Sequence, residues 1–220
     1  MTSTASNGYK GQGSGGAVHA NSISIYSSQF ISNYSDCCDG GGAIFSTCCL
    51  MVQDSRFVSN TVEQRMNGGA INAEGALFVT GSAFLNNSVV KAASNNTGRG
   101  GAIYVFFTAQ GYIENSIFQN NRANHGGAIT CDYRCEVLTS KFDNNVADQP
   151  DSFTFTNIGT GGAIQAAGDL VVQRSRFVRN STGVAGGAAV PRCRICRLVA
   201  HGKFRCVARE FPGFLPAALQ

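Results

Sequence analysis

Four potential metal ligands lie close together near the C-terminus. Cys193, Cys196, His201 and Cys206 have the spacing Cys-x2-Cys-x4-His-x4-Cys. Thiolate and imidazole groups at these intervals can close a tetrahedron around one zinc ion. The surrounding segment, 191–220, is basic, with six Lys or Arg residues against one Glu. Zinc at these ligands, with arginines against phosphate, would suit binding of single-stranded nucleic acid.

The residues between these ligands favour a different interpretation. Zinc knuckles share this spacing but usually carry Gly where this chain has Arg197 and Ala200. The composition also changes abruptly after Ala189, where the repeat described below stops. We therefore interpret 191–220 first as a basic, Cys-containing tail that is disordered or is an artefact of the gene end. Zinc-dependent nucleic-acid binding is the alternative.

The acidic residues are scattered, unlike those of enzymes that cleave polysaccharides. Such enzymes need paired carboxylates for acid–base catalysis, or clustered ones to hold calcium. We therefore expect no enzyme, and a polysaccharide lyase or hydrolase is the alternative. The scattered candidates are Asp36, Asp39, Asp132, Asp148, Asp151, Asp169 and His125.

The charge of the chain is unevenly distributed. Residues 1–190 hold 11 Lys or Arg against 12 Asp or Glu, a net charge of −1, whereas 191–220 have a net charge of +5. The first 190 residues are therefore not expected to bind nucleic acid. No apolar run approaches the roughly 18 residues of a membrane-spanning helix. The N-terminus lacks the apolar segment of a secretory signal, so we expect either a protein that is not exported or a fragment.

Two short motifs recur in a fixed register. Gly-Gly-Ala occurs seven times at intervals of 25 to 35 residues, and Ser-x-Phe-x-x-Asn follows each of the first six copies. The distance from the first Gly to the Phe is 15 to 18 residues. Such self-similarity is typical of solenoid proteins. The Gly-Gly-Ala motifs begin at Gly15, Gly41, Gly68, Gly100, Gly126, Gly161 and Gly186.

Within each unit the hydrophobic periodicity is that of short β-strands. Leu77 and Val79 alternate with other residues and so share one face. We expect three short strands per unit, and one such unit cannot bury its apolar face unless it stacks on its neighbour. The sequence therefore predicts an all-β, right-handed parallel β-helix of about six to seven coils over 15–190. Residues 1–14 would be disordered or form an incomplete N-terminal coil.

Equivalent residues of successive coils should form columns. Phe is expected to stack inside the core, beside a Ser small enough to leave room for the ring. Asn is expected at a turn, its amide bonding to the backbone and to the next Asn. These structural ladders are Phe30, Phe57, Phe84, Phe118, Phe142 and Phe177, and Asn33, Asn60, Asn87, Asn121, Asn145 and Asn180.

A third column follows the inward Ile or Val and should point outward. Its mixed aromatic and amide side chains would form an exposed strip able to bind carbohydrate or a protein surface. The alternative is an ordinary solvent-exposed face. Two long spacers, 88–99 and 146–160, leave the same corner and are a second candidate for recognition. The predicted strip is His19, Phe45, Asn72, Tyr104, Thr130 and Gln165.

The paired GGA[IV] and FxxN motifs resemble the repeats of chlamydial polymorphic outer membrane proteins. They are similar, more broadly, to repeats of right-handed, pectin-lyase-like β-helix proteins. The resemblance covers 15–190 and implies a surface-exposed β-helical passenger region that acts in adhesion. It also implies that further repeats lie beyond this chain.

Nine cysteines are many for a protein kept reduced. Three pairs of cysteines lie close together in the sequence and would form local disulfides in an exported protein, or remain buried thiols. They are Cys37-Cys38, Cys48-Cys49, and Cys131 with Cys135. Together these features predict a non-enzymatic β-helix repeat protein that is extracellular or at the cell surface. It would act as an adhesin or rigid display scaffold and need no cofactor.

Overall fold

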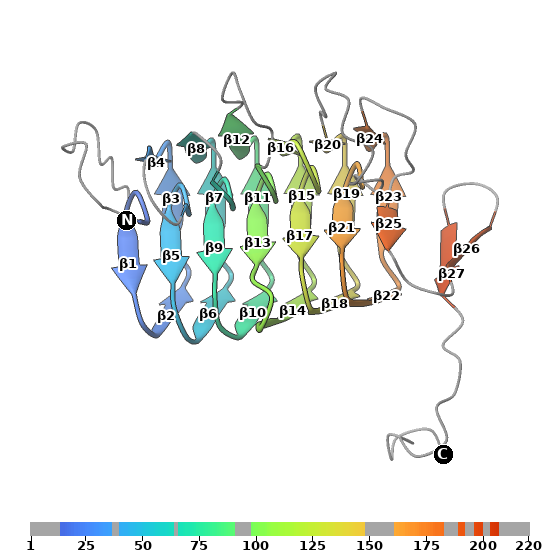
Figure 1. Cartoon of the computed structure of the whole chain (residues 1–220), viewed down its shortest axis with the longest axis horizontal. Coiled ribbons are helices and arrows are strands. Elements are labelled where there is room, and N and C mark those ends of the chain that lie inside the picture. Colours follow the sequence, from blue (N-terminus) through green and yellow to red (C-terminus); the bar gives the residue numbers. More distant parts are fainter. Residues whose placement is uncertain are drawn as a thin grey trace, which may run out of the picture.

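The computed structural model describes residues 14–36, 40–63, 66–90, 98–147, 161–182, 189–191, 196–199 and 203–206, the last three ranges as backbone only. All regular elements in these ranges are β-strands. Each strand of a coil pairs in parallel with its equivalent in the next coil, which produces four sheets along a rod (Figure 1). The chain is a right-handed parallel β-helix of about six coils, so the predicted fold class is confirmed.

The four sheets, named A to D in the order in which each coil visits them, have short strands. Sheet A contains β1 (Val18–Ala20), β5 (Ile44–Ser46), β9 (Ile71–Ala73), β13 (Ile103–Val105), β17 (Ile129–Cys131), β21 (Ile164–Ala166) and β25 (Ala189–Pro191). Sheet B contains β2 (Ile23–Tyr26), β6 (Leu50–Gln53), β10 (Leu77–Thr80), β14 (Gln110–Glu114), β18 (Arg134–Leu138) and β22 (Asp169–Gln173). Sheet C contains β3 (Gln29–Ile31), β7 (Arg56–Val58), β11 (Ala83–Leu85), β15 (Ile117–Gln119), β19 (Lys141–Asp143) and β23 (Arg176–Val178).

Sheet D, which follows the Asn of each repeat, was not expected. The prediction of three strands per unit is therefore wrong, because the few residues after the Asn also pair with the next coil. Val62, Val89 and Ala123 of this sheet form a second, small apolar cluster with Met66. Sheet D contains β4 (Tyr34–Ser35), β8 (Thr61–Glu63), β12 (Ser88–Val90), β16 (Arg122–Ala123), β20 (Val146–Ala147) and β24 (Ser181–Thr182).

The core is built from columns of identical or similar residues, as predicted. The aliphatic column of sheet A includes Ile44, Ile71 and Ile103, which are fully buried. The six Phe rings of sheet C stack face to face, with centroids 4.7–4.9 Å apart and planes within 4° of parallel. Each stacked pair adds about 1 kcal/mol beyond its buried area.

The Asn ladder satisfies its buried amides completely along the interior of the rod. Asn87 shows the pattern: its Nδ2 donates to Oδ1 of Asn121, 3.0 Å away, and to the carbonyl of Phe57, 3.1 Å away. Its Oδ1 accepts from both the backbone N–H and Nδ2 of Asn60. The predicted bonding of Asn to the backbone and to the next Asn is confirmed.

The Ser two residues before each Phe has a larger role than leaving room for the ring. Ser82 Oγ donates to the carbonyl of Thr80 and accepts from the backbone N–H of Ser55 in the preceding coil. The same pair of bonds recurs at Ser116 and Ser140. Ser thus forms a second hydrogen-bonded ladder, which joins sheets B and C.

Each coil turns at residues in the left-handed backbone region. One such residue precedes the ladder Ser, as Thr139 (φ 49°) does, and another precedes the ladder Asn, as Asn120 (φ 55°) does. Glycine fills the first of these positions only at Gly81 (φ 58°) among the described coils. Non-glycine residues therefore bear a local conformational cost that the ladders offset.

Several predicted features lie wholly or partly outside the described residues. These include the seventh Gly-Gly-Ala at Gly186, most of both long spacers, Cys193 and His201. In the tail, β26 (Cys196–Val199) and β27 (Lys203–Cys206) pair antiparallel, with the backbone of Cys196 opposite that of Cys206. The zinc interpretation remains a prediction.

Replacing Asn121 by Ala is expected to lower the free energy of unfolding by about 3 kcal/mol. The change leaves donors and acceptors of the two neighbouring coils without partners inside the core. Urea denaturation measures the loss. Asn120→Gly, at the left-handed neighbour, is the matched control and should destabilise the chain far less, because it removes only exposed bonds to Asn86 and Asn144. Equal losses in both variants would contradict a specific role for the ladder.

Replacing Thr139 by Asn is expected to stabilise the chain by about 1 kcal/mol. Asn tolerates positive φ whereas a β-branched residue does not. Thr80→Asn is the control and should lower the stability of the chain, because Thr80 lies in the strand β10, where Asn is unfavourable. Thermal unfolding of both variants gives the comparison, and a lower melting temperature for Thr139→Asn would refute the explanation.

Candidate functional site

The predicted outward strip is aligned as expected but is mostly not exposed. His19, Phe45, Asn72, Tyr104, Thr130 and Gln165 pair in register along sheet A. His19 is exposed and Gln165 is half-buried, whereas Phe45, Asn72, Tyr104 and Thr130 are at most 3% exposed. The prediction of an exposed binding strip is therefore wrong for these four residues.

The glycine corner explains this burial. Gly126 has φ 58°, which turns the preceding chain back over the outer side of sheet A. Thr130 Oγ1 donates to the carbonyl of His125, 3.0 Å away, so its side chain lies under that segment. Isolated parallel β-bridges hold this covering segment together from coil to coil, and they join Asn67 to Arg99 and Arg99 to His125. The outer side of sheet A is thus a second, partly polar interior.

One polar cluster lies between sheet A and the segment that covers its outer side. The Tyr104 hydroxyl and Arg99 Nη1 both donate to Oδ2 of Asp132, at 2.6 and 2.9 Å. Burial, followed by the bond to Asp132, raises the pKa of Tyr104 above its ordinary value. The cluster links two coils, and its buried phenol is locked as a hydrogen-bond donor.

Three of the carboxylates considered for catalysis lie outside the described residues: Asp39, Asp148 and Asp151. The other three lie on different coils: Asp36, Asp132 and Asp169. Asp132 is held as above, and Asp143 forms two-pronged contacts with Arg179. Glu136 pairs with Arg134 at 2.6 Å. Within the described residues, no group of three or more His, Cys, Asp and Glu side chains could hold a metal ion.

Three of the exposed large apolar side chains lie close together on sheet B: Tyr26, Met51 and Phe78. Met51, Phe78 and Tyr112 occupy one outward column, and Tyr26 stands in the next column. Met51 is 42% exposed, Phe78 48% and Tyr26 54%. We call these four residues the aromatic strip. Its sequence signal is a large apolar residue between two inward ones, as in Leu77–Phe78–Val79.

The strip is internally organised. The Tyr26 hydroxyl donates to the Met51 sulfur at 3.3 Å, and the rings of Phe78 and Tyr112 lie 6.3 Å apart. A shallow hollow of about 280 Å³ opens beside Met51 and Phe78. Its other lining residues are Ser22, Ile23, Ser24, Cys49 and Leu50.

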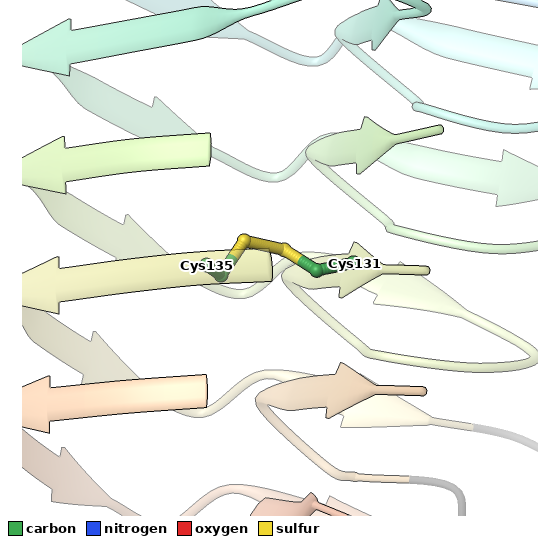
Figure 2. Close-up of a disulfide and its surroundings, with 2 residues drawn as sticks. All are labelled: Cys131 and Cys135. Atoms are coloured by element: carbon green, nitrogen blue, oxygen red, sulfur yellow. A yellow bond between two sulfur atoms is a disulfide. The ribbon is translucent and has the colours of Figure 1, made fainter. Parts of the chain in front are cut away.

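A disulfide between Cys131 and Cys135 closes the turn from β17 to β18 (Figure 2). Both residues are fully buried, and Cys135 takes the inward position held by Leu77 two coils earlier. One of the local disulfides that the sequence suggested is thus present. Cys48 and Cys49 are free thiols, and Cys37 and Cys38 lie outside the described residues.

The Tyr104 cluster predicts a dependence of stability on alkaline pH. A phenol with a raised pKa stays protonated in the folded chain while the unfolded chain loses its proton above about pH 10. Stability is therefore complete below that pH and falls as pH rises further. Tyr104→Phe should reduce this fall, as measured by urea midpoints at about pH 8 and about pH 11. Tyr133→Phe, at an exposed ring, is the control, and an equal effect there would contradict the assignment.

Among the described residues, no helix is long and apolar enough to cross a membrane. Comparison with curated proteins and with solved structures found no significant match. Residues 115–132, which contain one FxxN and one GGAI motif, match the model of the Chlamydia polymorphic membrane protein repeat. The predicted resemblance is thereby confirmed for this segment, and with the fold it supports a surface β-helix repeat protein.

Proposed function

We propose that this chain is part of a non-enzymatic surface or secreted protein, in which the β-helix holds an adhesive face rigidly. The aromatic strip on sheet B is that face. Contiguous exposed apolar side chains are uncommon on soluble proteins and mark interaction sites. The observation that carries the proposal is the row of the exposed Met51 and Phe78, continued on the next coil by the half-buried Tyr112.

A ligand of the aromatic strip must contact the side chains of sheet B and not its backbone. Strands β6, β10 and β14 are each paired on both sides within sheet B, so no extended peptide can add to their backbone. Ligand contact is therefore limited to rings, the thioether and the flanking hydroxyl and amide groups.

The charge of the strip favours a neutral ligand. Both outward columns of β2, β6 and β10 carry no charged residue; the flanking polar groups are Ser24, Gln53 and Thr80. At the β14 end of the strip the Tyr112 hydroxyl donates to the carboxylate of Glu114, which would repel an anionic ligand. Aromatic faces beside hydroxyl and amide groups suit a molecule with apolar C–H faces and many hydroxyls. We therefore assign a neutral glycan as the ligand class.

Two features support a location at the cell surface or outside the cell. The Cys131–Cys135 disulfide is of a kind that persists in oxidising compartments. The repeat that matches residues 115–132 is described as that of a membrane protein. Adhesion of the whole protein would then rest on repeated presentation of such faces.

Calorimetric titration with neutral oligosaccharides tests this function. Binding is expected, and Phe78→Ser should weaken it about ten-fold, since one aromatic contact contributes on the order of 1 kcal/mol. Ile117→Ser is the matched control, because Ile117 is 44% exposed but lies on sheet C. No binding of neutral glycans, or an equal loss in the control, would contradict the proposal. Binding of sulfated glycans or proteins without any binding of neutral glycans would also overturn the proposal.

A further inference from the structure

Two thiols lie side by side in the turn between β5 and β6. The Sγ atoms of Cys48 and Cys49 are 3.3 Å apart, and both cysteines are free. Cys49 is exposed and Cys48 is half-buried. The adhesive face makes no use of this pair as a pair, so its chemistry needs a separate explanation.

The pair is poorly placed to become a disulfide. Consecutive Cα atoms lie about 3.8 Å apart across a trans peptide, whereas disulfides usually join Cα atoms about 4.4–6.8 Å apart. No cis peptide occurs among the described residues. By contrast, the bonded Cys131 and Cys135 have Cα atoms 6.2 Å apart. The geometry therefore keeps Cys48 and Cys49 as two adjacent thiols.

The backbone at the pair is fixed by neighbouring coils. The N–H of Cys48 donates to the carbonyl of Asn21 at 2.8 Å, and Thr47 Oγ1 donates to Oδ1 of Asn21 at 2.9 Å. On the other side, a Cβ at Gly75 would lie 1.7 Å from the Cys48 carbonyl oxygen, so only glycine permits this approach. The two sulfurs are thus presented by a preorganised turn.

The surroundings favour a soft cation. Cys49 and Met51 line the same hollow, and the Met51 sulfur accepts a hydrogen bond from the Tyr26 hydroxyl in the metal-free chain. No Asp, Glu or His lines this hollow. Thiolate and thioether ligands without carboxylate or imidazole groups favour monovalent copper over harder ions.

We propose that Cys48 and Cys49 chelate one soft, thiophilic cation of the Cu(I) type, with the Met51 thioether as the third sulfur. Each thiol releases its proton to solvent as its sulfur binds the metal, and no electron is transferred. Metal–sulfur bonds of about 2.3 Å let one ion bridge sulfurs at the observed separation after a small rotation of the exposed side chains. The proposed copper site shares Met51 with the aromatic strip, so bound copper would occupy one side chain of the glycan-binding face.

Anaerobic titration with Cu(I) against a colorimetric Cu(I) chelator tests the site. The starting chain carries Ser at Cys37, Cys38, Cys193, Cys196 and Cys206, so that only this pair and the disulfide remain. One equivalent of Cu(I) should bind. Cys48→Ser and Cys49→Ser should each weaken binding at least about 100-fold, and Met51→Leu about ten-fold. Met66→Leu, at the other apolar cluster, is the matched control and should change nothing.

A second measurement guards against a variant that fails to fold. In the unsubstituted pair, bound Cu(I) should slow alkylation of the peptide containing Cys48 and Cys49 at least ten-fold, as followed by mass spectrometry. A folded chain that takes up no copper would overturn the proposal. So would uptake that survives replacement of both cysteines, or conversion of the pair into intermolecular disulfides with no copper bound. Because the probe is the metal alone, failure here leaves the glycan proposal unaffected.

Discussion

Backbone hydrogen bonding between successive coils is the constraint on which the rest of the structure depends. It places each residue directly beside its equivalent, about 4.8 Å away, as the Phe rings show. A residue type can then occupy an interior column only if it packs well against itself. Phe and Ile do so by surface contact, and Asn does so by donating and accepting in equal measure. A buried charge repeated at this spacing would repel its own copies.

This constraint explains which features the sequence could predict. The fold, the inward columns and the Asn bonding follow from repeated residues in a fixed register. The burial of Phe45 and Tyr104 could not be predicted, because it depends on how the glycine corner folds the preceding chain over the strand. Sheet D was missed because its two- or three-residue strands share no motif. The hydrogen-bonding role of the recurring Ser was missed because a small residue beside each Phe fits a purely steric role equally well.

The coils differ from one another at the positions that the repeat does not constrain. Outward positions of sheet B hold Ser24, Met51, Phe78 and Tyr112 on successive coils, and the backbone accepts all of them equally. The turn before β6 accepts two cysteines for the same reason. A solenoid of this kind separates the residues that hold the rod together from those that give one coil a particular surface.

The Asn ladder also gives the rod a direction. From Asn33 to Asn145 each side-chain amide donates to the ladder Asn of the following coil, and from Asn60 to Asn180 each oxygen accepts from the preceding one. The second N–H of each amide from Asn60 onward donates to the Phe carbonyl of the preceding coil. Aligned amide dipoles polarise one another, so the column has a donor end and an acceptor end, as a helix does. A new coil can therefore join only in one orientation. The ladder acts as a template during growth of the solenoid and excludes head-to-head stacking of two such rods through this column.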